Sequence, residues 1–162
     1  MRQLMISRQV VWLAVLLVIT AIMPRSNTIG RPPTAAEITT PSGLRYFDVV
    51  VGAGPTPRPG DWVTVQYIGH LTNGHEFYST YRGYGGLKAA PAYLPVGVQK
   101  IISGLDEGLL TMRVGGRRHL IIPPNLAYGN HRMGDRIPAN STLVYDAKLL
   151  SLSRQAPPVL RH

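Results

Sequence analysis

IISGLDEGLLTM, residues 101–112, holds the one segment of the chain with a convincing helical pattern. Leu105, Leu109 and Met112 recur at spacings of four and three, which places them in a single apolar stripe. Ser103 is expected to cap the helix, with Asp106 as its capping-box partner. One short helix cannot bury such a stripe alone, so the stripe must pack against a sheet built from the surrounding segments.

Those surrounding segments alternate apolar and polar residues with a period of two, as half-buried strands do. The expected strands are LRYFDVVV (44–51), DWVTVQYIGHL (61–71), HEFYS (75–79), RRHLII (117–122) and STLVYDAKLLSL (141–152). No alternation of strands with full-length helices supports parallel units. The predicted fold class is therefore α+β, with an antiparallel sheet wrapped on one helix.

The composition indicates one folded domain. The chain has 162 residues, 44% of them hydrophobic and 15% charged, and it contains no cysteine. The absence of cysteine excludes disulfides and thiol catalysis. The formal charge is +9, but the arginines are scattered and form no helical basic stripe with interleaved aromatics, so we do not predict binding to nucleic acid.

The amino terminus differs from the rest of the chain. Two arginines precede the apolar run VVWLAVLLVITAIM, residues 10–23, which is short for a spanning helix of about twenty residues and is typical of a secretory signal. No A-x-A cleavage site follows directly, so an uncleaved membrane tether is the alternative. We divide the chain into a signal peptide or membrane anchor (1–24), a flexible linker (25–42), the folded domain (43–153) and a tail (154–162).

Several kinds of chemistry lack their residues. The Gly52-Ala53-Gly54 turn has Pro57 where a dinucleotide loop needs its third glycine, and the histidines form no ligand cluster. No G-x-S-x-G elbow or carboxylate pair occurs. We therefore predict no cofactor and no metal. An apolar cup with a few phenols remains, which suits a reaction that needs neither a nucleophile nor proton transfer.

The segments PGDWVTVQYIGHLTNG (59–74), VGVQKIISGLDEGLLTMRVGGRR (96–118), IPPNLAYG (122–129) and IPANSTLVYDAKLLSL (137–152) resemble the FKBP-type peptidyl-prolyl cis-trans isomerases, the immunophilins that bind macrolide drugs. The resemblance runs from about Pro41 to Leu152, in order and with the family's spacing. It implies a five- or six-stranded antiparallel sheet curled around one short helix. It also implies isomerisation of Xaa-Pro bonds. Together with the leader, this predicts an isomerase for exported or lumenal proteins, with the bacterial periplasm or the thylakoid lumen as the expected compartment.

The resemblance also assigns roles to residues. Tyr128 is similar to the pocket phenol that donates a hydrogen bond to the ligand, Phe77 to the ring that faces the proline, and the backbone N–H of Ile102 to a second donor. The expected catalytic residues are Tyr67, Phe77, Ile102 and Tyr128, and the expected substrate-binding residues are Tyr78, Ile101, Leu105, Ile137 and Tyr145.

Three positions depart from the family pattern. Tyr78 occupies the place of an Asp, Leu105 that of a Trp at the pocket floor, and Ala92 that of another pocket aromatic. These departures predict weaker macrolide binding and lower isomerase activity. They leave open a noncatalytic peptide-binding chaperone or assembly factor on the same scaffold. The stretch STYRGYGGLKAAPAYLP (79–95) is either a surface flap or a partner-binding loop.

Overall fold

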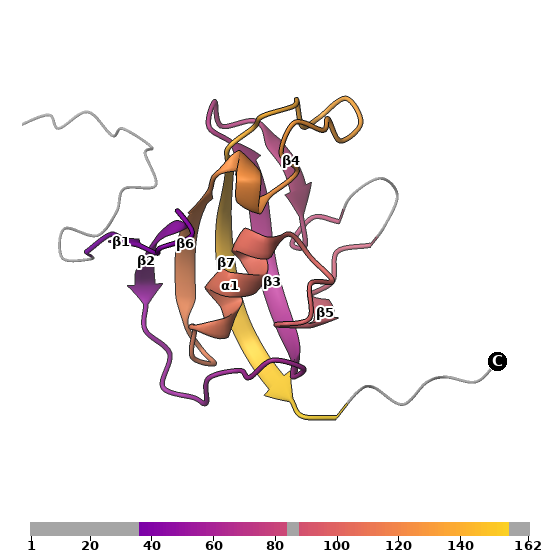
Figure 1. The fold of residues 1–162 in the computed structure, drawn as a ribbon. Coiled ribbons are helices and arrows are strands. Elements are labelled where there is room, and N and C mark those ends of the chain that lie inside the picture. Colours follow the sequence, from indigo (N-terminus) through magenta and orange to yellow (C-terminus); the bar gives the residue numbers. More distant parts are fainter. Residues whose placement is uncertain (1–35, 84–87, 156–162) are drawn as a thin grey trace, which may run out of the picture. The chain divides into compact units, whose positions relative to one another are not determined.

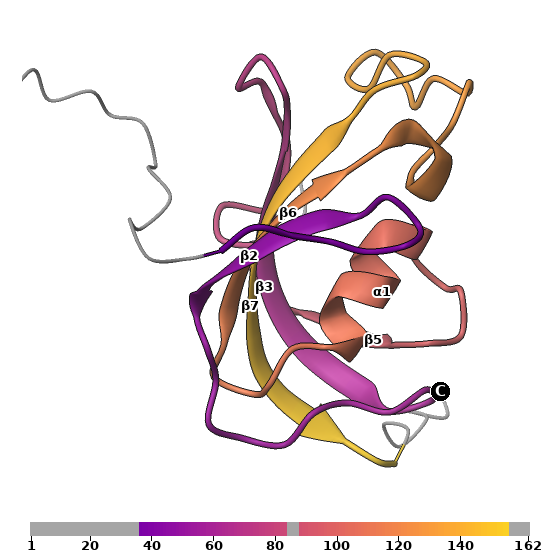
Figure 2. The ribbon, with the colours of Figure 1, turned by 60° about the vertical axis from the view of Figure 1, so that its left-hand side comes forward.

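The protein is described by a computed structural model over residues 36–83 and 88–155, all within one compact unit, Arg31–His162. The strands in this part of the chain are β1 (Ile38–Thr39), β2 (Arg45–Val50), β3 (Trp62–Leu71), β4 (Glu76–Ser79), β5 (Ala92–Pro95), β6 (Arg117–Ile122) and β7 (Leu143–Ser153). They form one antiparallel sheet in the order β1-β2-β6-β7-β3-β4, and β5 pairs with β3. The helix α1 (Ser103–Leu110) lies in the concave side of this sheet (Figures 1 and 2).

The antiparallel α+β architecture with one short helix confirms the predicted fold class. The sheet has seven strands rather than five or six in the described residues, because β1 and β5 were not expected. Both side chains of β1 are exposed, so β1 shows no alternation, and it lies inside the segment predicted as a linker. β5 pairs with Trp62–Val65. It was not expected because it contains Pro95 and follows Pro91, and proline argues against a strand.

The described residues contain no helix with the length and hydropathy of a membrane-spanning segment. The predicted leader, residues 1–24, lies outside the described residues, as does most of the predicted tail.

The period-two pattern correctly predicts which face of the sheet is buried. Val63 and Val65 of β3 and Leu143, Ala147 and Leu149 of β7 are fully buried. They meet the stripe of α1, whose predicted members Leu105, Leu109 and Met112 are all buried, although the helix ends at Leu110 and Met112 lies in the turn beyond it. The core is therefore one layer of side chains between the helix and the sheet.

The predicted cap of α1 is wrong. Ile102 is the N-cap residue and makes no side-chain capping bond, while Ser103 is already helical. The carboxylate of Asp106, only 6% exposed, accepts hydrogen bonds from the backbone N–H groups of Gly97 and Gln99, at 2.6 and 3.2 Å. A buried carboxylate needs such donors, so Asp106 fixes the segment that leads into the helix instead of closing a capping box.

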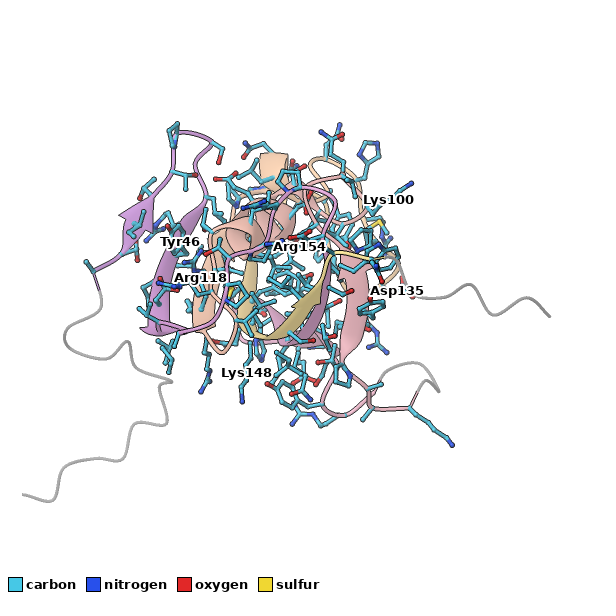
Figure 3. All side chains as sticks on the ribbon, turned by 90° about the horizontal axis from the view of Figure 1, so that it is seen from below. Tyr46, Lys100, Arg118, Asp135, Lys148 and Arg154 are labelled. Carbon is cyan, nitrogen blue, oxygen red and sulfur yellow. The ribbon has the colours of Figure 1, made fainter. Side chains whose placement is uncertain are left out.

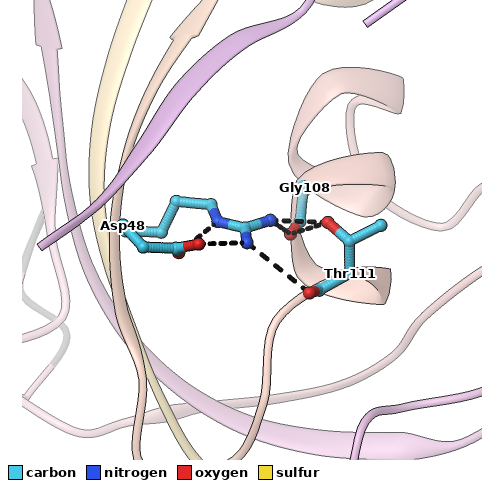
Figure 4. A network of polar contacts seen from close by, with 4 residues as sticks. Asp48, Gly108 and Thr111 are labelled. Carbon is cyan, nitrogen blue, oxygen red and sulfur yellow. Dashed lines mark hydrogen bonds and ion pairs between the residues drawn. The ribbon is translucent and has the colours of Figure 1, made fainter. Parts of the chain in front are cut away.

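A buried arginine joins α1 to the sheet. Arg118, on β6, is 3% exposed, and its guanidinium donates to both carboxylate oxygens of Asp48 at 2.7 and 2.9 Å. It also donates to the carbonyl of Gly108 at 2.9 Å and to both oxygens of Thr111 (Figure 4). Its carbon Cζ lies 3.9 Å from the ring centroid of Tyr46, beside which it stands in Figure 3. The cation thus neutralises Asp48 and satisfies carbonyls at the negative end of the helix dipole.

Two glycines let α1 approach β6 closely. A Cβ at Gly104 would lie 2.4 Å from Cγ2 of Ile122, and a Cβ at Gly108 would lie 2.4 Å from Cδ2 of Leu120. Both distances are far below ordinary van der Waals contact, so the helix surface must be bare at these points. We refer to this contact, with the Arg118 network at its end, as the seam.

Candidate functional site

Tyr67 and Tyr145 stand on the adjacent central strands β3 and β7, near one end of the sheet. Their ring centroids are 5.6 Å apart at an angle of 57°. Because side chains alternate along a strand, Tyr67 lies on the same helix-facing side as Val63 and Val65, two residues after Val65. Tyr78, on β4, stacks on Tyr67 with centroids 5.4 Å apart. Three phenols from three strands therefore gather on one face.

A bulge in β4 aims the Phe77 ring at this cluster. Gly69 pairs with Tyr78 and His70 with Glu76, so Phe77 is the extra residue on β4. Its ring meets that of Tyr145 edge-on, at 5.7 Å and 77°, and Phe77 is only 6% exposed. A Cβ at Gly69 would lie 2.6 Å from Cε2 and Cζ of Phe77. The absent side chain at Gly69 thus leaves the space that the ring fills.

The loop of residues 123–142, orange in Figure 1, supplies the opposite wall. It begins with the short helix η1 (Pro124–Leu126), and the N–H of Gly129 donates to the carbonyl of Pro124 at 2.8 Å. Gly129 has φ +58°, a conformation that favours glycine, and its carbonyl accepts from Asn140 at 2.7 Å. Tyr128 is thereby held in a turn closed at both ends.

These elements enclose a cavity of about 330 Å³. Its lining consists of Tyr67, Phe77, Tyr78, Tyr128, Met133, Arg136, Ile137 and Tyr145. The volume is at the low end for small-ligand sites, so the cavity fits a group the size of a proline and its flanking amides better than a long segment. We refer to it as the pocket.

Three phenols of the pocket have raised pKa values. Burial raises the pKa of Tyr67, and the neighbouring Tyr78 and Tyr128 raise it further. Burial likewise raises the pKa of Tyr128 and, most strongly, of Tyr145. Each group therefore keeps its proton and remains able to donate a hydrogen bond. No carboxylate lines the pocket in the described part of the chain, so the arrangement suits hydrogen-bond donation and desolvation rather than proton transfer.

The pocket brings together six of the nine predicted site residues and leaves three outside its lining. Leu105 is 3% exposed and belongs to the core. Ile101 and Ile102 are half-buried and pack against the core next to the start of α1. The carbonyl of Ile102 accepts from the N–H groups of Leu105 and Asp106, both at 3.0 Å. No described residue accepts from the N–H of Ile102, so that donor is available to a ligand.

The sequence did not predict two residues of the lining, Met133 and Arg136. Both lie in the loop between the predicted residues Tyr128 and Ile137. Met133 and Ile137 bridge through reciprocal backbone hydrogen bonds of 2.8 and 3.3 Å, which folds this segment back onto the pocket. Their position between two pocket residues was the available signal.

The histidine spacing predicted no metal site. The described residues contain no group of three or more His, Cys, Asp or Glu that could hold a metal ion.

Comparison with known proteins places this geometry in a family. The sequence profile described as FKBP-type peptidyl-prolyl cis-trans isomerase matches residues 54–150. An FK506-binding protein 4 of Dictyostelium discoideum is 44% identical over 124 residues, which are 76% of this chain and 32% of that protein. An FK506-binding protein 4 of Mycosarcoma maydis is 40% identical over 135 residues, 80% of this chain and 34% of that protein. The chain thus spans about a third of the length of these two relatives.

Solved structures show the same fold. The crystal structure of AtFKBP13 has a TM-score of 0.66 and 36% identity, and the match covers 73% of this chain and 99% of that one. FkpA from Escherichia coli has a TM-score of 0.65 and 38% identity, over 72% of this chain and 51% of that one. The profile covers more than half of the chain, and its segment contains all the residues that line the pocket. The chain therefore belongs to the FKBP-type peptidyl-prolyl cis-trans isomerase family.

Proposed function

We propose that this chain catalyses cis–trans isomerisation of Xaa-Pro bonds in polypeptides. The observation that carries the proposal is the pocket, in which phenols and apolar side chains meet with one cation, Arg136, and without a carboxylate. Family membership supports the same activity.

The physics of the peptide bond explains why such a pocket suffices. Rotation about an amide costs roughly 18 to 20 kcal/mol because resonance is lost at the perpendicular geometry. The planar amide is charge-separated and well solvated by water, whereas the twisted form is less polar, so an apolar enclosure favours the twisted form. A thousandfold acceleration needs only about 4 kcal/mol. Desolvation and one or two hydrogen bonds are of that size.

We assign the donors and walls as follows. The hydroxyl of Tyr128 donates to a carbonyl of the bound segment, and the available N–H of Ile102 is the second donor. The ring of Phe77 faces the proline. Tyr67, Tyr145 and Ile137 form the remaining walls, while Ile101 and Leu105 support the pocket from the start of α1.

A second function rests on the three departures from the family pattern. Tyr78 fills the place of an Asp and stacks on Tyr67, so a phenol contacts Tyr67 where the family pattern has a carboxylate. Leu105 and Ala92 present no ring to a ligand. We accordingly propose weakened binding of macrolides such as FK506. A noncatalytic peptide-binding chaperone or assembly factor is the alternative that the same departures favour.

A rate assay on several Xaa-Pro peptides distinguishes the two functions. The chain contains two phenylalanines, Phe77 in the pocket and Phe47 stacked on His119 on the other face of the sheet, so each serves as the control for the other. We expect wild type and Phe47→Leu to accelerate isomerisation. Phe77→Leu should lower kcat/KM by about tenfold or more, because a flat ring and its burial are lost. An intact fold with no acceleration by wild type would favour the binding module.

We also propose that the protein acts on exported or lumenal proteins, on the basis of the apolar run at residues 10–23. The relatives named above come from eukaryotes, Dictyostelium and a fungus, and one matched structure comes from a bacterium. Amino-terminal sequencing of the mature protein tests export. A terminus after Arg25 indicates a cleaved signal, and a terminus before it indicates a membrane tether or a protein that is not exported.

A further inference from the structure

The face of the sheet opposite α1 carries a second, larger cavity of about 740 Å³. Its floor crosses β2, β6, β7 and β3, which are consecutive neighbours in the sheet. Three inter-strand spacings make the floor about 14 Å long. Tyr81 and Arg82, which follow β4, form its wall at the β3 end. We refer to this cavity as the trough. It shares no lining residue with the pocket.

Pairing registers resolve the floor into two rows of outward side chains. In one row, Phe47 pairs with His119 and His119 with Asp146. This row is internally satisfied, because Phe47 stacks on His119 at 4.8 Å and Nδ1 of His119 lies 3.0 Å from Oδ1 of Asp146. In the other row, Val50 pairs with Arg117, Arg117 with Lys148, and Lys148 with Gln66. The second row contains two cations and no carboxylate.

The pairing of Arg117 with Lys148 is unfavourable by itself. Like charges directly opposite each other on antiparallel strands destabilise a sheet. Both side chains are exposed, and Figure 3 shows Lys148 extending from β7 away from α1. Lys148 has no ion-pair partner among the described residues, and the nearest anion to Arg117 in the trough is Asp146, which already bonds His119. A bound anion between the two cations would remove this repulsion.

The rest of the lining includes three large apolar side chains, Val50, Ile68 and Tyr81. Val50 and Tyr81 are 51% and 46% exposed, so both offer apolar surface to a ligand in the trough. Ile68 lies between them on the floor. Arg82 adds a third positive charge at the β3 end, where it is paired with Glu76. A ligand that fits this lining alternates negative charges with apolar groups.

We propose that the trough binds an extended acidic polypeptide segment, in which carboxylates contact Arg117 and Lys148 while apolar side chains contact Val50, Ile68 and Tyr81. An extended chain rises about 3.3 Å per residue, so the floor accommodates about four residues. The net charge of +9 attracts such a segment over a longer range. A nucleic acid fits less well, because its phosphates would gain nothing from the apolar floor. This site is separate from the pocket and does not depend on isomerase activity.

The test measures binding of the full chain to a fluorescently labelled peptide of about eight residues that alternates Glu with Leu and contains no proline, so that it spans the floor but offers nothing to the pocket. The variant is Arg117→Glu with Lys148→Glu. The matched control is Lys100→Glu with Arg154→Glu, which makes the same change of charge at two exposed positions outside the trough. An uncharged prolyl peptide reports the isomerisation rate of each protein.

We expect the trough variant to weaken peptide binding by about tenfold or more and the control by about twofold or less, since two exposed attractions become repulsions only in the first. The isomerisation rate should be the same in all three proteins. If the charge-reversed variant does not fold, Arg117→Met with Lys148→Met replaces it, with a smaller expected loss in the same direction.

Three results would overturn the proposal. The first is no binding of the peptide to wild type. The second is an equal loss in the trough variant and the control, which would indicate attraction to net charge alone. The third is a single-stranded oligonucleotide of similar length that binds wild type more tightly than the peptide and loses affinity in the trough variant, which would identify a nucleic acid as the occupant.

Discussion

Two regions of the molecule differ in how their polar groups are satisfied. One is the seam between α1 and β6, and the other is the pocket between β4 and the loop of residues 123–142. Both combine glycines and polar groups with packed side chains. At the seam, the helix glycines lie directly on core side chains and Arg118 has all its donors occupied from inside the protein. In the pocket, the phenols of Tyr67 and Tyr128 are only partly buried and face a cavity.

This difference separates stability from activity. A substitution at the seam removes partners that water cannot replace, so its cost appears in the free energy of unfolding. A substitution at the rim of the pocket removes a group that water partly solvates, so its cost should appear in the rate. Substitutions at Phe77 and Gly69 should affect both stability and rate, because Phe77 is a buried core residue and its ring is also a wall of the pocket.

Arg118→Leu should break the seam and produce the largest effect. It leaves Asp48 without its partner and exposes no replacement donor for the carbonyl of Gly108. We expect a loss of about 3 kcal/mol or more in the free energy of unfolding, measured in urea, with kcat/KM of the folded fraction unchanged. Arg117→Leu, one residue away and exposed, is the control and should change stability by less than about 0.5 kcal/mol. Equal effects would show that the buried network contributes nothing special.

Gly69→Ala should affect both properties. The new methyl group would lie 2.6 Å from the Phe77 ring and 3.1 Å from the Tyr145 ring, so the ring of Phe77 must move. We expect a stability loss of about 1 to 3 kcal/mol together with a fall in kcat/KM. Adding Phe77→Leu should recover part of the stability, because the clash is relieved, but not the rate. A full recovery of the rate would remove Phe77 from the proposed mechanism.

The sequence predicts the framework of this fold because one physical rule governs it. Alternation along residues 61–71 and 141–152 reports burial directly, and the structure has the expected faces. The rule is silent where backbone pairing alone makes a strand, as in β1. It also misleads at α1, since Asp106 matches a capping-box pattern while its carboxylate bonds the backbone of Gly97 and Gln99. That choice depends on the segment seven to nine residues earlier in the sequence as well as on the local pattern.

The residues of the pocket likewise fall into those that the sequence predicts and those that it does not. Tyr67 and Tyr145 follow from strand periodicity, and the family resemblance adds Phe77 and Tyr128. The bulge that turns Phe77 over Gly69 cannot be found by counting residues, because it depends on a register shift between two strands. Met133 and Arg136 were missed because backbone bonds across a loop, rather than any periodic pattern, bring them to the lining.

Tyr128→Phe should affect the rate alone. It removes one hydroxyl from a half-buried ring and keeps the ring, so stability should change by less than about 0.5 kcal/mol. If the hydroxyl donates to the substrate carbonyl, its loss costs about 0.5 to 1.5 kcal/mol, which is a two- to tenfold fall in kcat/KM. Tyr93→Phe, on β5 and outside the pocket lining, is the control. An unchanged rate would leave Tyr128 as a wall without a donor role.

The smallest expected effect is a rate that barely changes with pH. Burial raises the pKa of Tyr67, Tyr128 and Tyr145, so these phenols stay neutral while free tyrosine begins to ionise near pH 10. The unfolded chain loses its phenolic protons first. The stability that the neutral phenols contribute is therefore complete below about pH 10 and is lost as pH rises further, toward the folded-state values. We expect kcat/KM to be flat from pH 7 to about 10, with phenolate absorbance of the three rings appearing only as the protein unfolds. A rate that falls within that range while the fold persists would mean that a pocket phenol ionises in the folded protein, and the neutral donors of the proposed mechanism would have to be abandoned.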